Sequence, residues 1–200
     1  MRVFIGIDLD DAIRGKIARF LEGVSPFAPE ARWVRPESLH ITLKFIGEQK
    51  EEQVMGIAER LRGVASEPIE IQVSSHGFFP TLKSARVFWI GIQAGQELAA
   101  LAGQIDARVA ELGIEREKRT FSPHLTLARA GGRPGDPKRR KSDRPNSVFE
   151  VLQRRVAAMG EIDFGTMTAN KFILYQSQLS PTGSKYTKLE RFPMSSAMKS

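Results

Sequence analysis

The sequence predicts an α+β fold built from antiparallel sheets, and two observations lead to this prediction. Stretches typical of strands and of helices are mixed without the regular strand–helix–strand rhythm of a parallel sheet. A short pattern also occurs twice, as SLHITL at residues 38–43 and SPHLTL at residues 122–127, each with a glycine seven residues after the histidine. The copies are too far apart for a solenoid repeat, so we interpret them as parts of two related halves.

Four helices are expected where apolar side chains recur at helical spacing. The first begins at Asp10, a residue suited to cap a helix N-terminus, and the third ends before Gly113, which suits a left-handed C-terminal cap. The expected helices cover residues 10–23, 51–64, 97–112 and 147–158. The expected strands cover residues 2–8, 31–34, 39–46, 69–73, 85–92, 124–129, 161–175 and 185–192.

The composition is that of a globular protein with a surplus of basic residues. Thirty Lys and Arg residues against 23 Asp and Glu give a formal net charge of +7, which favours a polyanionic partner, although many basic proteins have none. The chain has no cysteine, which excludes disulfides and thiolate metal sites. No apolar run approaches the ~20 residues of a membrane helix, and Asp8 comes too early for a signal peptide. We therefore expect a cytoplasmic protein with no membrane association.

Two of the three histidines, His40 and His124, stand in identical His-x-Thr-Leu settings. In a strand, residues two positions apart point to the same face, so each imidazole is expected to project beside a hydroxyl, that of Thr42 or Thr126. If the two halves face each other about a pseudo-twofold axis, both pairs converge on one cleft that fits a phosphate. His76 has no such partner, and we expect it to be structural or exposed.

Two imidazole–hydroxyl pairs suit the hydrolysis of a cyclic phosphodiester. One imidazole can activate water as a base, and the other can protonate the departing ribose oxygen on the opposite side of phosphorus. The hydroxyls can donate to the non-bridging oxygens, and ring strain in a five-membered cyclic phosphate removes the need for a metal ion. A zinc site is the competing use of histidines, but it requires a third protein ligand that neither copy of the motif supplies. We expect no metal and no cofactor.

Several segments besides the doubled motif resemble one branch of a known superfamily. The sequence resembles the two-histidine (2H) phosphoesterases, and within them the bacterial and archaeal RNA 2′,3′-cyclic phosphodiesterases, historically labelled 2′-5′ RNA ligases. The resemblance covers nearly the whole chain. It is carried by residues 32–47 and 121–129 around the two histidines, by 77–80 and 85–91 as a middle hairpin, and by 174–177, Gly183 and Tyr186 near the C-terminus.

The resemblance implies a bilobal fold, in which two antiparallel sheets flanked by helices form one domain over residues 1–200. Its two lobes are interleaved, each carries one motif, and the active-site cleft lies between them. It also implies that His40 donates a proton to the leaving 3′ oxygen and that His124 accepts one from water, which leaves a 2′-phosphomonoester. The residues alone do not say which histidine is the acid. The implied substrate is RNA with a 2′,3′-cyclic phosphate end, and the implied phosphate-binding residues are Thr42, Thr126 and Arg129.

Three residues that follow the motifs depend on strand alternation for their orientation. Under strict alternation Arg129 would share the apolar face of the second motif, so a strand end or a bulge near Ala128 is needed for it to reach a phosphate. Lys44 shares the face of His40, which makes it a candidate anion contact. Phe45 could stack a base, but alternation places it on the apolar side, and we expect it in the core.

Some alternatives stay open at this point. A loop over residues 131–145 carries six Arg and Lys residues against two Asp, and it is either a solvated loop or a contact to the RNA backbone. The function could instead be that of a phosphodiesterase for a small cyclic nucleotide, or of an RNA-binding or 2′-5′ RNA end-joining module with little turnover. Because one chain supplies both motifs, a monomer is sufficient and no protein partner is expected.

Overall fold

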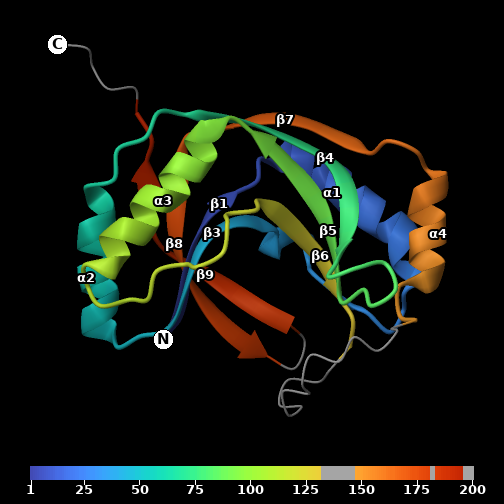
Figure 1. The fold of residues 1–200 in the computed structure, drawn as a ribbon, viewed down its shortest axis with the longest axis horizontal. Helices are drawn as coiled ribbons and strands as arrows, with labels where there is room; N and C mark the ends of the chain where they lie inside the picture. Colours follow the sequence, from blue (N-terminus) through green and yellow to red (C-terminus); the bar gives the residue numbers. More distant parts are fainter. Residues whose placement is uncertain (132–146, 181–182, 196–200) are drawn as a thin grey trace.

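The computed structural model describes residues 1–131, 147–180 and 183–195, and the expected basic loop lies outside these ranges except for Gly131. The described chain has the α+β arrangement that the sequence predicts (Figure 1). Two short 3-10 turns lie at Ser25–Phe27 and Pro36–Ser38. In chain order the other elements are β1 (Arg2–Asp8), α1 (Asp11–Val24), β2 (Arg32–Trp33), β3 (His40–Glu48), α2 (Glu51–Arg62), β4 (Ile69–Phe79), β5 (Val87–Ala94), α3 (Gln96–Ala110), β6 (His124–Arg129), α4 (Glu150–Ala158), β7 (Asp163–Ala169), β8 (Lys171–Ser180) and β9 (Gly183–Pro193).

The strands form two antiparallel sheets that share one plan. The first sheet has the order β3-β1-β8-β9, and the second has the order β2-β6-β5-β4-β7. In the first, the motif strand β3 pairs with β1 and helix α1 connects the two; in the second, the motif strand β6 pairs with β5 and helix α3 connects them. This correspondence fits the pseudo-twofold relation expected from the doubled motif.

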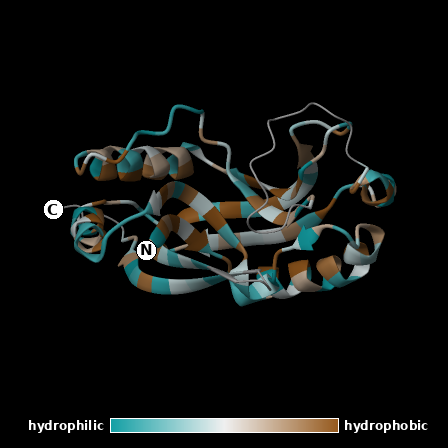
Figure 2. Ribbon diagram, turned by 90° about the horizontal axis from the view of Figure 1, so that it is seen from below, coloured by the Kyte–Doolittle hydropathy of each residue, from teal (hydrophilic) through white to brown (hydrophobic). Residues whose placement is uncertain are grey.

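The helices cross between the two sheets. Helix α1 follows a strand of the first sheet but contacts β7 of the second, whereas α3 follows a strand of the second sheet but contacts β3 of the first. Helix α2 packs beside α3 and α4 beside α1, so two helix pairs lie at opposite ends of the molecule with the strands between them (Figure 2). As predicted, Asp10 caps α1: its carboxylate accepts a hydrogen bond from the Ile13 backbone N–H at 2.7 Å.

The segment 161–175, expected as one strand, is divided between two. Strand β7 ends at Ala169 in the second sheet and β8 begins at Lys171 in the first, so the chain changes sheets at Asn170. The prediction is wrong here because buried apolar residues occur on both sides of the break, with no glycine or proline to mark it. The crossing matters for the site, since it places β8 directly beside β1.

Both motif strands contain a bulge at the same distance from the histidine. In β3 the partners of Thr42 and Lys44 are consecutive residues of β1, so Leu43 is an extra residue without a partner. In β6 the partners of Thr126 and Ala128 are consecutive residues of β5, and Leu127 is the extra residue. One extra residue reverses the alternation of everything that follows in a strand. The residue five positions after each histidine therefore lies on the same face as the histidine.

Because of the bulges, the expected orientations of Phe45 and Lys44 are wrong. The bulge that Arg129 needs in order to leave the apolar face is present. Phe45 is 61% exposed and not in the core. Lys44 is buried on the other face of β3, where its Nζ donates to Asp106 Oδ1 at 2.6 Å and to the Glu115 carbonyl at 2.7 Å, so its expected place beside His40 is wrong. Arg129 is exposed, because the bulge required near Ala128 is present at Leu127.

Breaking the buried ion pair between Lys44 and Asp106 should lower the stability of the protein without removing a residue of the candidate site. Lys44→Met keeps most of the side-chain volume but leaves a largely buried carboxylate short of one cation, so the free energy of unfolding should fall by about 3 kcal/mol in urea denaturation. Lys118→Met, which breaks the exposed pair with Glu115, should change it by less than about 1 kcal/mol. Equal effects from the two variants would contradict this account of Lys44.

Candidate active site

The two motif histidines begin the two strands that meet between the sheets. His40 is the first residue of β3 and His124 the first residue of β6, and these strands contact each other although they belong to different sheets. Burial lowers the pKa of His40 most strongly, and the charge of Arg129, at the end of β6, also lowers this pKa, so Arg129 lies near His40. The end of the second motif strand thus approaches the first motif histidine across the gap between the sheets.

The two imidazoles are held by identical hydrogen bonds. His40 Nδ1 lies 2.8 Å from the Ser38 carbonyl oxygen, and His124 Nδ1 lies 2.8 Å from the Ser122 carbonyl oxygen. A carbonyl oxygen can only accept, so each Nδ1 carries the proton and donates it. The Nε2 of each neutral ring is then left with a free lone pair, and it gains a proton only when the ring becomes cationic. Each ring therefore offers Nε2 for proton transfer.

Aromatic rings surround each imidazole. The ring centroid of His40 lies 4.6 Å from that of Phe4 and 5.0 Å from that of Tyr186. The centroid of His124 lies 5.4 Å from that of Phe79 and 6.5 Å from that of Trp89. Both imidazoles are half-buried, so the aromatic rings limit their contact with solvent.

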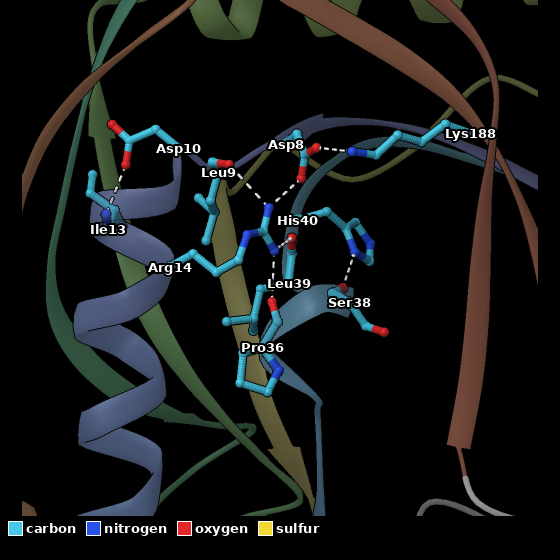
Figure 3. A network of polar contacts seen from close by, with 10 residues as sticks. All are labelled: Asp8, Leu9, Asp10, Ile13, Arg14, Pro36, Ser38, Leu39, His40 and Lys188. Atoms are coloured by element: carbon cyan, nitrogen blue, oxygen red, sulfur yellow. Dashed lines mark hydrogen bonds and ion pairs between the residues drawn. The ribbon is translucent and has the colours of Figure 1, made fainter.

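A carboxylate lies behind His40. Asp8 is the register partner of His40 in the adjacent strand, and it forms ion pairs with Arg14, at 2.5 Å, and with Lys188 (Figure 3). Burial raises the pKa of Asp8, but the hydrogen bond from Lys188 and the charges of both cations outweigh this effect and hold the pKa below its usual value. Asp8 is therefore a permanent negative charge near His40 at neutral pH.

Arg14 links this carboxylate to the turn that precedes the first motif. Its guanidinium donates to the carbonyl oxygens of Pro36, at 2.7 Å, and Leu9, at 3.0 Å, as well as to Asp8. Figure 3 shows the guanidinium between the start of α1 and the turn at residues 36–38. Arg14 thereby fixes the backbone that supplies the Ser38 carbonyl to the imidazole.

Opposing influences set the protonation of His40. Burial lowers its pKa most strongly, the hydrogen bond to the Ser38 carbonyl and the charge of Asp8 raise it, and the charges of Arg129 and Arg14 lower it again. The net result is a pKa below the ordinary value of histidine. His40 is therefore mainly neutral at pH 7 in the free protein, and an anion bound beside it would favour its cationic form.

The threonines of the motifs and the third histidine are also placed by the structure. Thr42 and Thr126 are half-buried two residues after the histidines, on the histidine side of each bulge. His76 lies in β4, where burial lowers its pKa and its ring meets that of Phe88 with the centroids 6.3 Å apart. It belongs to neither motif strand, and β5 separates its strand from β6 in the second sheet.

A cavity of about 550 Å³ opens beside His40. Phe4, Ser38 and Tyr186 contact His40 and also line this cavity, which connects it to the imidazole. Among the described residues its lining includes no Asp or Glu. Its charged and aromatic lining consists of Arg2, Arg32, Arg35, Arg129, Phe4, Trp33, Phe45 and Tyr186. Such a lining combines positive charge with flat apolar rings, the two features that bind nucleotides.

Within residues 1–131, 147–180 and 183–195, no three side chains of His, Cys, Asp or Glu gather in a way that could hold a metal ion. No helix within the same ranges combines the length and the apolar character needed to cross a bilayer.

The sequence matches the family described as LigT like Phosphoesterase twice, over residues 7–89 and 90–186. The chain belongs to this family. Each match contains one motif histidine. The two matches to this LigT-like phosphoesterase therefore correspond to the two halves that the doubled motif indicates.

Relatives match this LigT-like phosphoesterase over nearly their full length. A protein of Archaeoglobus fulgidus named RNA 2′,3′-cyclic phosphodiesterase is 36% identical over 96% of this chain and 99% of that protein. One of Methanocaldococcus jannaschii with the same name is 32% identical over 96% and 100%. The crystal structure of E. coli LigT complexed with 3′-AMP is similar with a TM-score of 0.73 and 25% identity, covering 98% of each chain.

Sequence reasoning missed several residues around the motifs. Asp8 and Arg32 were not singled out, because only the strand register places them beside His40 and Arg129. Arg14 was not singled out either, because it reaches Asp8 and Pro36 from helix α1. Asp8 did carry a usable signal, since it is an acidic residue that directly ends a buried apolar strand. Phe4 and Arg2 gave no signal, because alternate residues of a buried strand look alike until the sheet order is known.

The shared hydrogen bond predicts the tautomer of both motif histidines. At a pH where the rings are neutral, ¹⁵N chemical shifts should show protonated Nδ1 and unprotonated Nε2 for His40 and His124. Long-range ¹H–¹⁵N spectra of the labelled protein measure this, and the His76→Ala variant assigns the remaining signals. Protonated Nε2 in either motif ring would contradict the proposed orientation.

Proposed function

We propose that this LigT-like phosphoesterase hydrolyses 2′,3′-cyclic phosphate ends of RNA to 2′-phosphomonoesters, as an RNA 2′,3′-cyclic phosphodiesterase. The observation that carries the proposal is the pair of imidazoles, each held through Nδ1 by a backbone carbonyl and each offering Nε2. The names of the full-length relatives support the choice of substrate. The cavity rich in arginine and aromatic side chains suits a nucleotide beside the reacting phosphate.

The proposed reaction needs two proton transfers on opposite sides of phosphorus. His124 Nε2 accepts a proton from water as the water oxygen bonds to phosphorus, and His40, in its cationic form, donates its Nε2 proton to the 3′ oxygen as the P–O3′ bond breaks. The products are a free 3′ hydroxyl and a 2′-phosphomonoester. The two rings exchange protons with solvent before the next turnover.

Asp8 supports the assignment of His40 as the acid. An acid must carry a proton when the substrate is bound, and the negative charge of Asp8 favours the cationic imidazole of His40. The register partner of His124 in β5 is Gly91, which carries no charge. The asymmetry between the two strand pairs thus favours His40 as donor and His124 as acceptor.

Thr42, Thr126 and Arg129 are the proposed contacts to the non-bridging phosphate oxygens. Each threonine follows its histidine on the same face of the strand, and Arg129 lies on this face because of the bulge at Leu127. Hydroxyl and guanidinium donors stabilise the charge that develops on these oxygens. We further propose that residues 1–200 form one domain of two interleaved lobes that acts as a cytoplasmic monomer, since one chain supplies both motifs.

The proposal is tested with an RNA oligonucleotide that ends in a 2′,3′-cyclic phosphate, in excess chelator. The wild-type protein should release the 2′-phosphate product, and His40→Ala and His124→Ala should each lower kcat/KM by about a hundredfold to ten-thousandfold. His76→Ala is the matched control and should retain activity, because its ring packs against the buried Phe88 and it belongs to neither motif strand. Binding without turnover by the wild-type protein would contradict the proposal and favour an RNA-binding module.

The role of Asp8 predicts a change in pH dependence. Removing its negative charge lowers the pKa of His40, so in Asp8→Asn the acid loses its proton at lower pH and the alkaline limb of the kcat/KM profile should shift downward. Asp10→Asn is the control: the residue is close in sequence, and asparagine also caps a helix. An alkaline limb that stays in place in Asp8→Asn, or moves upward, would reject His40 as the acid.

A further inference from the structure

Two arginines face each other on the rim of the cavity. Arg32, in the short strand β2, is the register partner of Arg129 in β6, and both side chains are exposed and line the cavity. Partial desolvation lowers the pKa of Arg129, and the positive charge of Arg32 also lowers it, which shows that the two guanidinium groups interact. The fold therefore holds a pair of like charges side by side.

Such a pair costs stability when nothing offsets its repulsion. Like charges directly opposite each other on antiparallel strands are destabilising. Within the described lining of the cavity, no carboxylate offsets this pair, and Arg2 adds further positive charge from β1. A bound anion removes the repulsion, and the planar donor geometry of two guanidinium groups matches the oxygens of a phosphate.

The position of this pair relative to His40 limits which phosphate it can bind. Arg129 lies near enough to His40 to affect its pKa, while Arg32 is the strand neighbour of Arg129 on the side of β2, the edge strand. The same cavity is lined by the exposed ring of Phe45 and by the ring of Tyr186, which contacts His40. An aromatic surface of this kind stacks a base. The volume of the cavity, about 550 Å³, suits one nucleotide.

We propose that Arg32 binds the phosphate on the 5′ oxygen of the terminal nucleotide, with Arg129 between that phosphate and the reacting one. This deepens the proposed function, on which it rests. In a nucleotide the 5′ oxygen leaves the ribose on the side away from the 2′ and 3′ oxygens, so a cyclic phosphate at the histidines directs the 5′ phosphate outward along the cavity. The substrate class is then a 5′-phosphorylated or chain-terminal nucleotide, and a nucleoside 2′,3′-cyclic phosphate without the 5′ phosphate is a poor substrate.

Equilibrium binding of two product analogues tests this subsite without turnover. Calorimetry should show that the wild-type protein binds adenosine 2′,5′-bisphosphate about tenfold or more tightly than adenosine 2′-monophosphate, because the extra phosphate gains charge-assisted hydrogen bonds. Arg32→Ala should remove most of this preference, because it should weaken binding of the bisphosphate much more than binding of the monophosphate. Arg32→Lys, which keeps the charge but loses the two-pronged donor geometry, should retain an intermediate preference.

A matched control separates the subsite from general charge attraction. Arg19→Ala removes the same charge from the exposed surface of α1, outside the cavity lining, and should keep the full preference for the bisphosphate. No preference in the wild-type protein, or equal losses in Arg19→Ala and Arg32→Ala, would overturn the proposal. A preference that depends on Arg32 in a protein without hydrolytic activity would leave the subsite standing and reject only the proposed hydrolysis.

Discussion

The hydrogen bond from each motif imidazole to the carbonyl two residues before it is the constraint on which the candidate site depends. It fixes the tautomer and leaves Nε2 as the nitrogen available to a substrate. The surrounding features serve the same end at His40. Arg14 ties down the backbone before Ser38, and Phe4 and Tyr186 fix the plane of the ring. Without this bond the imidazole could turn, and proximity of the two motif strands would not by itself produce a matched pair of proton carriers.

The paired bulges explain how one short motif can serve both chemistry and recognition. Up to the bulge, each strand places a histidine and a threonine on one face and apolar side chains on the other. Beyond it, the order reverses, so Phe45 and Arg129 turn toward the cavity while Lys44 joins Asp106 in the interior. Equivalent positions of the two halves have thus acquired different tasks, one aromatic and one cationic. In this way a cleft lined by two related strands becomes asymmetric. An asymmetric cleft is needed to bind a chain molecule whose two ends differ.

The sequence predicts the fold class, the helices, most strands and the two motif pairs, because periodicity and a doubled motif are local signals. It predicts the orientations of Lys44 and Phe45 wrongly, because a bulge leaves no mark in a run such as Leu43-Lys44-Phe45 in which alternation looks uninterrupted. The strand break at Asn170 is missed for a similar reason. The roles of Asp8 and Arg32 follow from their partners in the neighbouring strands, His40 and Arg129. These partners could not be predicted, because strand register is a property of the folded chain.

The strand order also determines when the surroundings of His40 are completed during synthesis of the chain. The wall around His40 draws on both ends of the chain, with Asp8 and Phe4 from the first strand and Tyr186 and Lys188 from the last. Strand β9 is synthesised after the rest of its sheet, so the surroundings of His40 are complete only once β9 has paired with β8.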